Sequence, residues 1–220
     1  MLATEMADKN DWTREEIAEE ISSHTAVTIP VNSRIEAQQL ILDLSEMNRI
    51  LNEAKLIALG ECYCRKKYQK CDGPIDVCLN LNKEAEGFIS QGLAKKVDLK
   101  EALEALRRSH EAGLVHIAYT FKGKEKPEVI CSCCSCCCHS MSALVRFGMP
   151  EAVTVSKYIA ANNPETCVSC GTCVERCQFK ARQLKNGKMT YNSSRCFGCG
   201  LCVSTCPTQS NSLVNRETNR

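Results

Sequence analysis

The chain has 220 residues, eighteen of them cysteines, and its formal net charge is +2 at pH 7. This length allows one medium-sized domain with a small one, or two small domains. So many cysteines indicate a disulfide framework or metal binding, and the nearly balanced charge does not suggest a nucleic-acid partner.

No secretory signal or membrane span is expected. The first ten residues are polar, with no apolar core, and no segment approaches eighteen consecutive apolar residues. We therefore expect a soluble cytoplasmic protein, in which thiols stay reduced and a cysteine cluster favours metal over disulfides.

Two stretches before the first cysteine are predicted to be helical. Thr13 is followed three residues later by Glu16, the spacing of a capping box at the start of a short helix, and Trp12 beside it is expected to pack. Between residues 33 and 59, apolar side chains recur at steps of three and four. This spacing predicts one or two amphipathic helices that end near Gly60.

A first group of cysteines comes next, at Cys62, Cys64, Cys71 and Cys78. The basic run Arg65-Lys66-Lys67, with Lys70, lies among them. These cations have three interpretations: they stabilise thiolates, they dock an acidic redox partner, or they form a solvated loop.

A helix and a pair of strands are predicted between the two cysteine groups. Asp98 with Glu101 three residues later is a second capping box, and the helix it starts should run to about Gly113. Residues 114–121 are typical of a strand, and Val129-Ile130 would return beside it after a turn.

The second cysteine group is a dense run of six cysteines in eight positions, followed by His139. Adjacent residues cannot both reach one metal without backbone strain, and alternate residues of an extended segment point to opposite faces. Two sites, or one site with free thiols, are therefore predicted. One face would hold Cys131, Cys133 and Cys137, and the other would hold Cys134, Cys136 and Cys138.

Three interpretations of these upstream cysteines compete. The first is a third [4Fe-4S] cluster, with room for a fourth; the second is a structural zinc ion; the third is disulfides or inert thiols, which would oxidise readily without metal. His139 could cap such a site, although a histidine in this place is more often a surface or hydrogen-bonding residue. The candidate ligands are Cys62, Cys64, Cys71, Cys78, Cys131, Cys133, Cys134, Cys136 and Cys137.

The last part of the chain carries one cysteine pattern twice, at an offset of 29 residues. Three cysteines at steps of three let a loop wrap one face of a [4Fe-4S] cubane, and the fourth cysteine serves the other cluster. Zinc needs only two Cys-x2-Cys pairs and does not explain the third cysteine or the repeat. Cluster I would be held by Cys167, Cys170, Cys173 and Cys206, and cluster II by Cys196, Cys199, Cys202 and Cys177.

Between the two copies, Asn186-Gly187 is flanked by residues that can alternate faces, over 182–191. This is typical of a hairpin with a type I′ turn. Residues 165 to about 214 thus resemble the bacterial dicluster ferredoxins, which have a hairpin at this place. One departure is that Gln178 follows Cys177, where the second copy has the usual proline, Pro207; the turn should loosen slightly without losing a ligand.

A wider resemblance covers residues 40–215. The elements Cys62-Tyr63-Cys64-Arg65, Cys71-Asp72-Gly73-Pro74, Cys78-Leu79, Gly113-Leu114-Val115-His116 and the run from Cys131 to Cys138 are similar to those of larger cysteine-rich ferredoxin-like 4Fe-4S proteins of anaerobic prokaryotes. The resemblance implies iron–sulfur chemistry without naming a partner.

The expected fold class is α+β, with a helical cysteine-rich N-terminal region before a dicluster ferredoxin-like domain. The boundaries would be a partly helical segment at 1–32, an α-rich metal-binding region at 33–160, and the ferredoxin-like domain with its tail at 161–220.

The expected function is electron transfer through two [4Fe-4S] clusters, with an additional iron–sulfur or zinc centre upstream. The chain would act as a carrier or oxidoreductase subunit, with redox proteins or a larger complex as partners and no nucleic acid. Two alternatives are thiol–disulfide chemistry at the dense run and a redox-sensing interaction protein.

Overall fold

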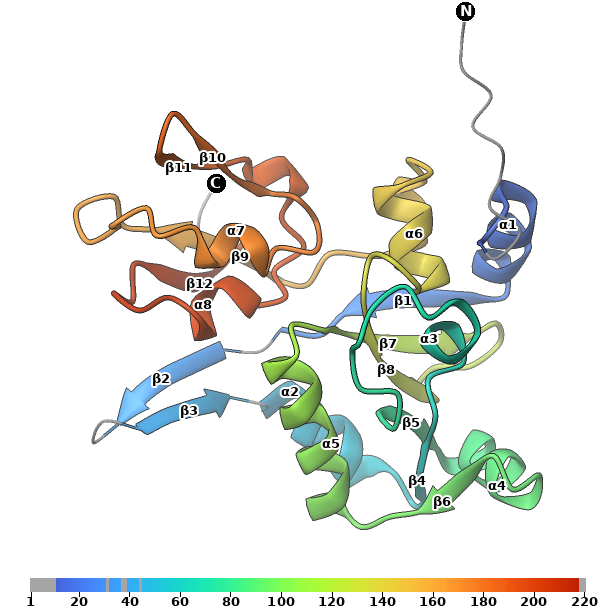
Figure 1. The fold of residues 1–220 in the computed structure, drawn as a ribbon. Coiled ribbons are helices and arrows are strands. Elements are labelled where there is room, and N and C mark those ends of the chain that lie inside the picture. Colours follow the sequence, from blue (N-terminus) through green and yellow to red (C-terminus); the bar gives the residue numbers. More distant parts are fainter. Residues whose placement is uncertain (1–10, 31, 37–38, 44, 218–220) are drawn as a thin grey trace, which may run out of the picture.

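An antiparallel sheet of six strands forms the centre of the first two thirds of the chain (Figure 1). The computed structural model describes residues 11–30, 32–36, 39–43 and 45–217, so the first ten residues of the predicted segment 1–32 lie outside the described part. The strand order is β1-β7-β8-β5-β4-β6, and each neighbouring pair is antiparallel. The strands are β1 (His24–Thr28), β4 (Ile57–Gly60), β5 (Cys78–Leu81), β6 (Ala94–Lys96), β7 (Val115–Phe121) and β8 (Val129–Cys133).

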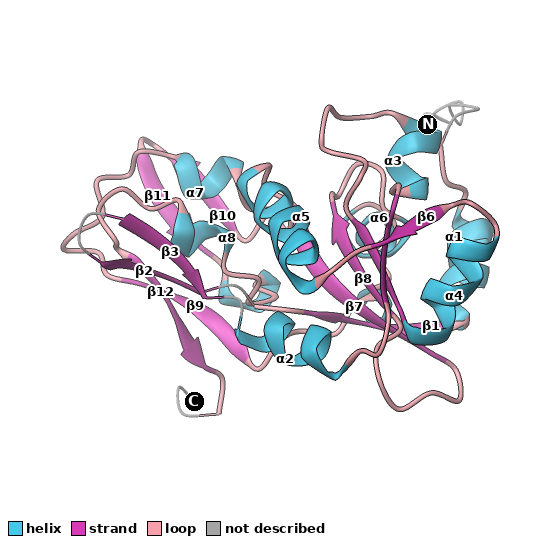
Figure 2. Cartoon of the chain, turned by 90° about the horizontal axis from the view of Figure 1, so that it is seen from below, coloured by secondary structure: helices cyan, strands magenta, loops and turns pink. Residues whose placement is uncertain are grey.

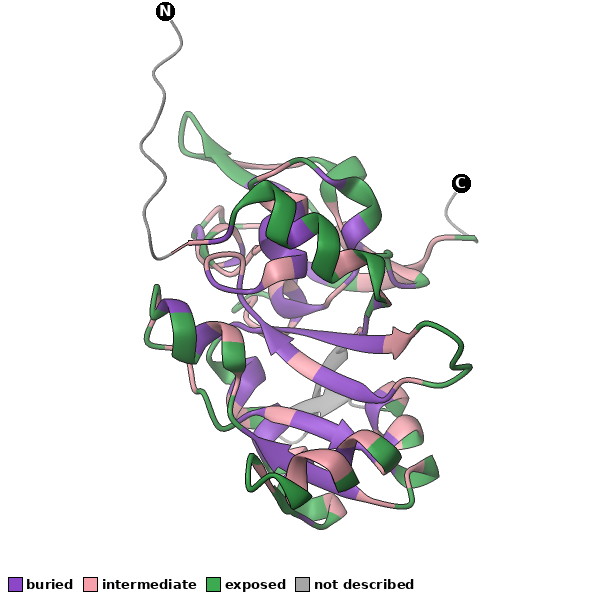
Figure 3. Ribbon diagram, turned by 90° about the vertical axis from the view of Figure 1, so that its right-hand side faces the viewer, coloured by how far each residue is buried: buried purple, intermediate pink, exposed green. Residues whose placement is uncertain are grey.

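Helices cover both faces of this sheet and build a core on each. The helices of this part are α1 (Arg14–Ser22), α2 (Ser45–Glu53), α3 (Tyr63–Tyr68), α4 (Asn82–Ser90), α5 (Leu99–Glu111) and α6 (His139–Val145), with a short 3-10 turn at Pro150–Ala152. The core under α2 and α5 contains Met47, Leu106 and Ile130. The opposite core, under α1 and α6, contains Ile17, Met141 and most of the dense cysteine run. Figure 3 shows how much of the sheet is buried between these layers.

Several local predictions are confirmed. Both capping boxes are present, at Thr13 with Glu16 and at Asp98 with Glu101. The strand predicted at 114–121 is β7, and β8 pairs with it. Trp12 packs as expected, with 7% of its surface exposed.

The helix predicted over residues 33–59 is only partly correct. Ser45–Glu53 is helical, but β2 (Asn32–Glu36) pairs with β3 (Gln39–Asp43), and Ile57–Gly60 is a strand. Short apolar runs satisfy helical spacing and strand spacing equally well, and pairing with neighbouring strands decides between them. The region 33–160 therefore has a sheet at its centre and is not mainly helical, while the α+β class is confirmed.

The C-terminal part is a small unit at one end of the molecule (Figure 2), and the end of α5 contacts it through Arg176, which donates to the carbonyls of His110 and Glu111. Its elements are β9 (Tyr158–Asn162), α7 (Thr172–Glu175), β10 (Arg182–Lys185), β11 (Lys188–Tyr191), a 3-10 turn at Ser193–Arg195, α8 (Leu201–Ser204) and β12 (Asn211–Asn215). Strand β9 pairs with β12, so this unit starts by Tyr158.

The predicted hairpin is confirmed as β10 and β11, with φ of 50° at Asn186 and 74° at Gly187, as a type I′ turn requires. No helix in the described part of the chain is long and apolar enough to span a bilayer.

Candidate metal centres

The sequence repeat is reproduced in the backbone of the C-terminal unit. Three pairs of residues with left-handed φ are each separated by 29 positions: Ser169 and Gly198, Gly171 and Gly200, and Lys180 and Gln209. Helices α7 and α8 are related in the same way. At Gly198 a Cβ atom would collide with the Tyr158 carbonyl oxygen, so glycine is required there for close packing as well as for its φ.

The eight cysteines of this unit line two cavities, and each cavity takes three from one copy and the fourth from the other. One is lined by Cys167, Cys170, Cys173 and Cys206, and the other by Cys177, Cys196, Cys199 and Cys202. The structure therefore brings together each crossed set predicted from the spacing. At equivalent positions, the amide of Ala181 donates to the Cys177 sulfur at 3.3 Å and that of Ser210 to the Cys206 sulfur at 3.2 Å.

A buried guanidinium, that of Arg182, lines the cavity of Cys177, Cys196, Cys199 and Cys202. Arg182 is 2% exposed, and its charge interacts with Cys202 of one set and Cys173 of the other. No carboxylate pairs with it within the described residues. A buried cation without a counterion is costly, so this position is suited to sites that carry negative charge.

Residues 159–213 match the family model of the 4Fe-4S dicluster domain. The C-terminal unit is a ferredoxin-like dicluster domain. Its donor set is appropriate for iron–sulfur clusters, because the cysteines surround a space and main-chain N–H groups point at their sulfurs. Comparison of the whole chain with curated proteins gave no match.

The two cavities of the dicluster domain differ in their surroundings. Cys170 is exposed. Cys177 and Cys199, by contrast, pack against the core that contains the dense cysteine run. Burial also raises the pKa of Cys202 to about 12, although the charge of Arg182 opposes this; a bound metal would favour the thiolate further. One set thus faces solvent and the other faces the N-terminal half.

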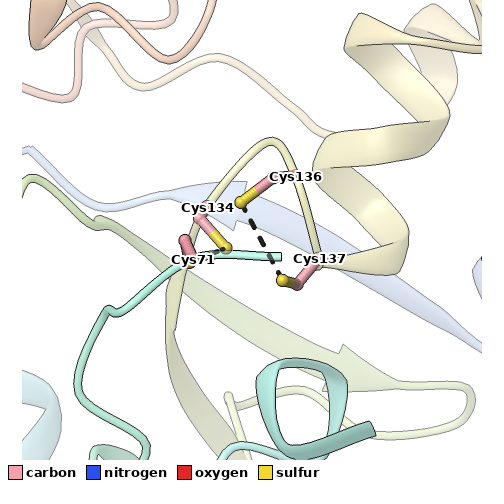
Figure 4. Close-up of side chains that lie close together, drawn as sticks. All are labelled: Cys71, Cys134, Cys136 and Cys137. Atoms are coloured by element: carbon pink, nitrogen blue, oxygen red, sulfur yellow. Dashed lines mark hydrogen bonds between the residues drawn. The ribbon is translucent and has the colours of Figure 1, made fainter. Parts of the chain in front are cut away.

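Upstream, four cysteines form a compact group: Cys71, Cys134, Cys136 and Cys137 (Figure 4). Their sulfurs all lie within 4.8 Å of one another, with 3.7 Å between Cys71 and Cys134 and 3.9 Å between Cys136 and Cys137. A Zn–S bond of about 2.3 Å gives about 3.8 Å between the sulfurs of a tetrahedral site. The compact group therefore has the size of a single tetrahedral ion, whereas a cubane places its thiolates on four different irons.

The compact group corrects one prediction about the dense run. Adjacent cysteines were expected not to share a site, yet Cys136 and Cys137 both belong to it. Strand β8 ends at Cys133, and residues 135–137 form a turn. Alternation of faces therefore stops at Cys133, and Cys137 and Cys138 each lie on the side opposite to that predicted.

Two side chains that sequence reasoning undervalued, Trp12 and Arg65, hold the compact group in place. The Trp12 indole N–H donates to the Cys137 carbonyl at 2.8 Å. Arg65, 2% exposed, donates to the Ser132 carbonyl at 2.8 Å and approaches the Cys134 sulfur at 3.9 Å. Burial opposes ionisation of Cys134, but hydrogen bonds from Cys136 and Arg65 outweigh it and lower the pKa of this thiol.

The other predicted upstream ligands lie outside the compact group. They are Cys62, Cys64, Cys78, Cys131 and Cys133, and Cys138 joins them. His139 belongs to the same side, because its Nδ1 lies 3.6 Å from the Cys64 sulfur. The residues of the basic run differ in burial: Arg65 is buried, whereas Lys66 is exposed and forms an ion pair with Glu61.

Gln178, the departure from the ferredoxin pattern, joins the two halves of the molecule. Its Oε1 accepts from the Ser135 amide at 3.1 Å and from the Ser135 hydroxyl at 2.9 Å, and its Nε2 donates to the Gly113 carbonyl at 3.0 Å. Because Gln178 follows Cys177 and Ser135 lies between Cys134 and Cys136, this contact links the dicluster domain directly to the compact group. No local sequence signal predicts it, since Ser135 is 43 positions away.

Proposed function

We propose that the protein carries single electrons between redox partners through two [4Fe-4S] clusters. The ligands would be Cys167, Cys170, Cys173 and Cys206 for cluster I, and Cys196, Cys199, Cys202 and Cys177 for cluster II. The main support is the pair of four-cysteine cavities related by the 29-residue repeat. Bound clusters supply a one-electron couple at each site.

The chain's own groups would stabilise the reduced, more negative state of these sites. The amides of Ala181 and Ser210 point at sulfurs, and the buried guanidinium of Arg182 adds a fixed positive charge. All three favour negative charge and therefore raise the reduction potential.

The different exposure of the two cavities suggests a direction. An external redox protein would approach at the exposed Cys170. The cluster II cavity packs on the N-terminal half, through Cys177 and Cys199. We further propose that the compact group of Cys71, Cys134, Cys136 and Cys137 holds one zinc ion, which would cross-link the Cys71 loop to the turn after β8.

The first test is analysis of anaerobically purified full-length protein. We expect the dicluster domain to contribute about eight irons and eight acid-labile sulfides, with electron paramagnetic resonance (EPR) signals that appear on reduction. Iron near zero with stoichiometric zinc would refute the proposal.

Single variants then test the crossed ligand sets. Cys177→Ser should alter the same EPR signal as Cys199→Ser and leave the signal altered by Cys170→Ser intact. If Cys177→Ser and Cys170→Ser altered the same signal, the ligands would not cross. Ser204→Ala, close to Cys202 and Cys206 but carrying no thiol, is the control and should alter neither signal.

A further inference from the structure

The six upstream cysteines outside the compact group face a common space on one side of the large sheet. In the sheet register Leu79 pairs with Ile130, so Cys78 lies opposite Cys131 on neighbouring strands, and Cys133 is two residues further along the same face. Cys62 comes just before α3 and Cys64 lies in it, whereas Cys138 comes just before α6. Four separate elements, β5, β8, α3 and α6, thus contribute thiols to this space, which we call the six-thiol chamber.

Contacts within the six-thiol chamber divide its members into two kinds. The thiols of Cys131 and Cys138 lie next to the sulfur of Cys133, and the Tyr119 hydroxyl lies 3.7 Å from the sulfurs of Cys133 and Cys138. The sulfurs of Cys131 and Cys78 are 4.0 Å apart. Cys133 therefore lies at the centre of this set, with the thiols of Cys131 and Cys138 and the Tyr119 hydroxyl around it.

The remaining thiols interact at longer range. Cys62 and Cys64 both interact electrostatically with Cys78 and with Cys133, without hydrogen bonds between these thiols. Among the described residues, the compact group is the one set of three or more metal-binding side chains whose ligand atoms all lie within 4.8 Å. The eight cysteines of the dicluster domain form no such set either. Like the cluster cavities, and unlike the compact group, the six-thiol chamber therefore has no three sulfurs that all lie within 4.8 Å of one another.

Charge supplies an independent argument. Arg65 interacts with Cys62 and Cys133 of the six-thiol chamber as well as with Cys134 of the compact group. It has no carboxylate partner within the described part of the chain, and its remaining hydrogen bonds go to the carbonyls of Pro74 and Ser132. Among the described residues, Arg65 and Arg182 have the largest side chains that are fully buried. Arg182 is a buried cation beside the cysteines of the dicluster domain, and Arg65 is a buried cation beside the upstream cysteines. This likeness indicates that thiolates lie next to Arg65 both in the six-thiol chamber and in the compact group.

We propose that the six-thiol chamber binds a third iron–sulfur cluster of the [4Fe-4S] class, separate from the ion of the compact group. Its ligands are Cys62, Cys64, Cys78 and Cys133. Cys131, Cys138 and the Tyr119 hydroxyl donate hydrogen bonds to the ligand sulfurs. This site does not depend on the proposed function of the dicluster domain, because its thiols come entirely from other elements.

Metal counting on the full chain tests the proposal. Wild-type protein should contain about twelve irons and twelve sulfides, with about one zinc. The double variant Cys62→Ser/Cys64→Ser should lose about four irons and four sulfides, keep its zinc, and retain the EPR signals of the dicluster domain. The double variant Cys134→Ser/Cys136→Ser should lose zinc and keep its iron.

Two control variants separate ligands from neighbours. Cys131→Ala removes a thiol on the same face of β8, and Ser132→Ala changes the opposite face; both should keep about twelve irons. Loss of four irons from Cys131→Ala would refute the ligand assignment. Loss of zinc alone from Cys62→Ser/Cys64→Ser would refute an iron–sulfur cluster at the six-thiol chamber.

The unmodified protein provides a test that does not depend on a variant folding. Mössbauer spectra of ⁵⁷Fe-labelled wild-type protein should contain three [4Fe-4S] components of equal area. About eight irons, with upstream disulfides found by thiol counting, would refute the six-thiol chamber as a cluster site. That result would leave the function of the dicluster domain intact, whereas near-zero iron would refute both.

Discussion

Replacing Gln178 by alanine should weaken the junction between the dicluster domain and the dense cysteine run. The side chain makes three hydrogen bonds of 2.9 to 3.1 Å, two accepted from Ser135 and one donated to Gly113. Each contributes about 0.5–1.5 kcal/mol net, so their loss should cost about 2–4 kcal/mol. This corresponds to a change of roughly 30- to 1000-fold in the equilibrium constant for opening the junction.

Hydrogen exchange on the holoprotein is the appropriate assay, because unfolding of a metal-loaded chain is rarely reversible. The Ser135 amide should exchange roughly 30- to 1000-fold faster in Gln178→Ala if it exchanges by opening of the junction. Gln178→Glu keeps both acceptor contacts and should show a smaller increase. Gln183→Ala, an exposed glutamine of the same domain, is the matched control. An increase below about threefold in Gln178→Ala would show that the side chain does not hold the junction.

Three further predictions concern buried charge. Arg182→Met should lower the cluster potentials by on the order of 60 mV, or 1.4 kcal/mol for one electron, in an EPR-monitored titration; an unchanged potential would contradict this. Arg65→Met should reduce upstream metal while the exposed Lys66→Met does not, as metal analysis would show. Burial lowers the pKa of His116 to about 3 and of His110 to about 4. Both stay neutral when folded, so stability should fall as pH drops below about 6.5, by roughly 3 kcal/mol at pH 5.5; unchanged protection of the core amides in hydrogen exchange, corrected for intrinsic rates over that range, would contradict this.

Local chemistry made the dicluster domain predictable. Its ligand spacing recurs after 29 residues, and Asn186-Gly187 specifies its turn without help from distant residues. The two capping boxes are equally local, since each helix start is fixed within four residues. These features depend on neighbours in the sequence and are visible in a single chain.

The large sheet was not predictable in the same way. The run Ile57-Ala58-Leu59 is apolar throughout and fits a helix or a buried strand; its pairing with β5 and β6 decides the outcome. The two sets of upstream cysteines were likewise hidden, because Cys71 joins residues more than sixty positions later. Face alternation correctly separated Cys131 and Cys133 from Cys134 and Cys136, and it failed where the strand ended.

The contacts of the first described residues have a consequence for biosynthesis. Trp12 caps the Cys137 carbonyl, 125 positions later, and Arg14 donates to the carbonyl of Phe147, 133 positions later. A nascent chain cannot make these contacts until the segment up to Phe147 has left the ribosome. The segment of Trp12 and Arg14 therefore docks late. We expect the thiols of the dense run to be open to metal donors during translation and to become closed off once these two side chains have docked.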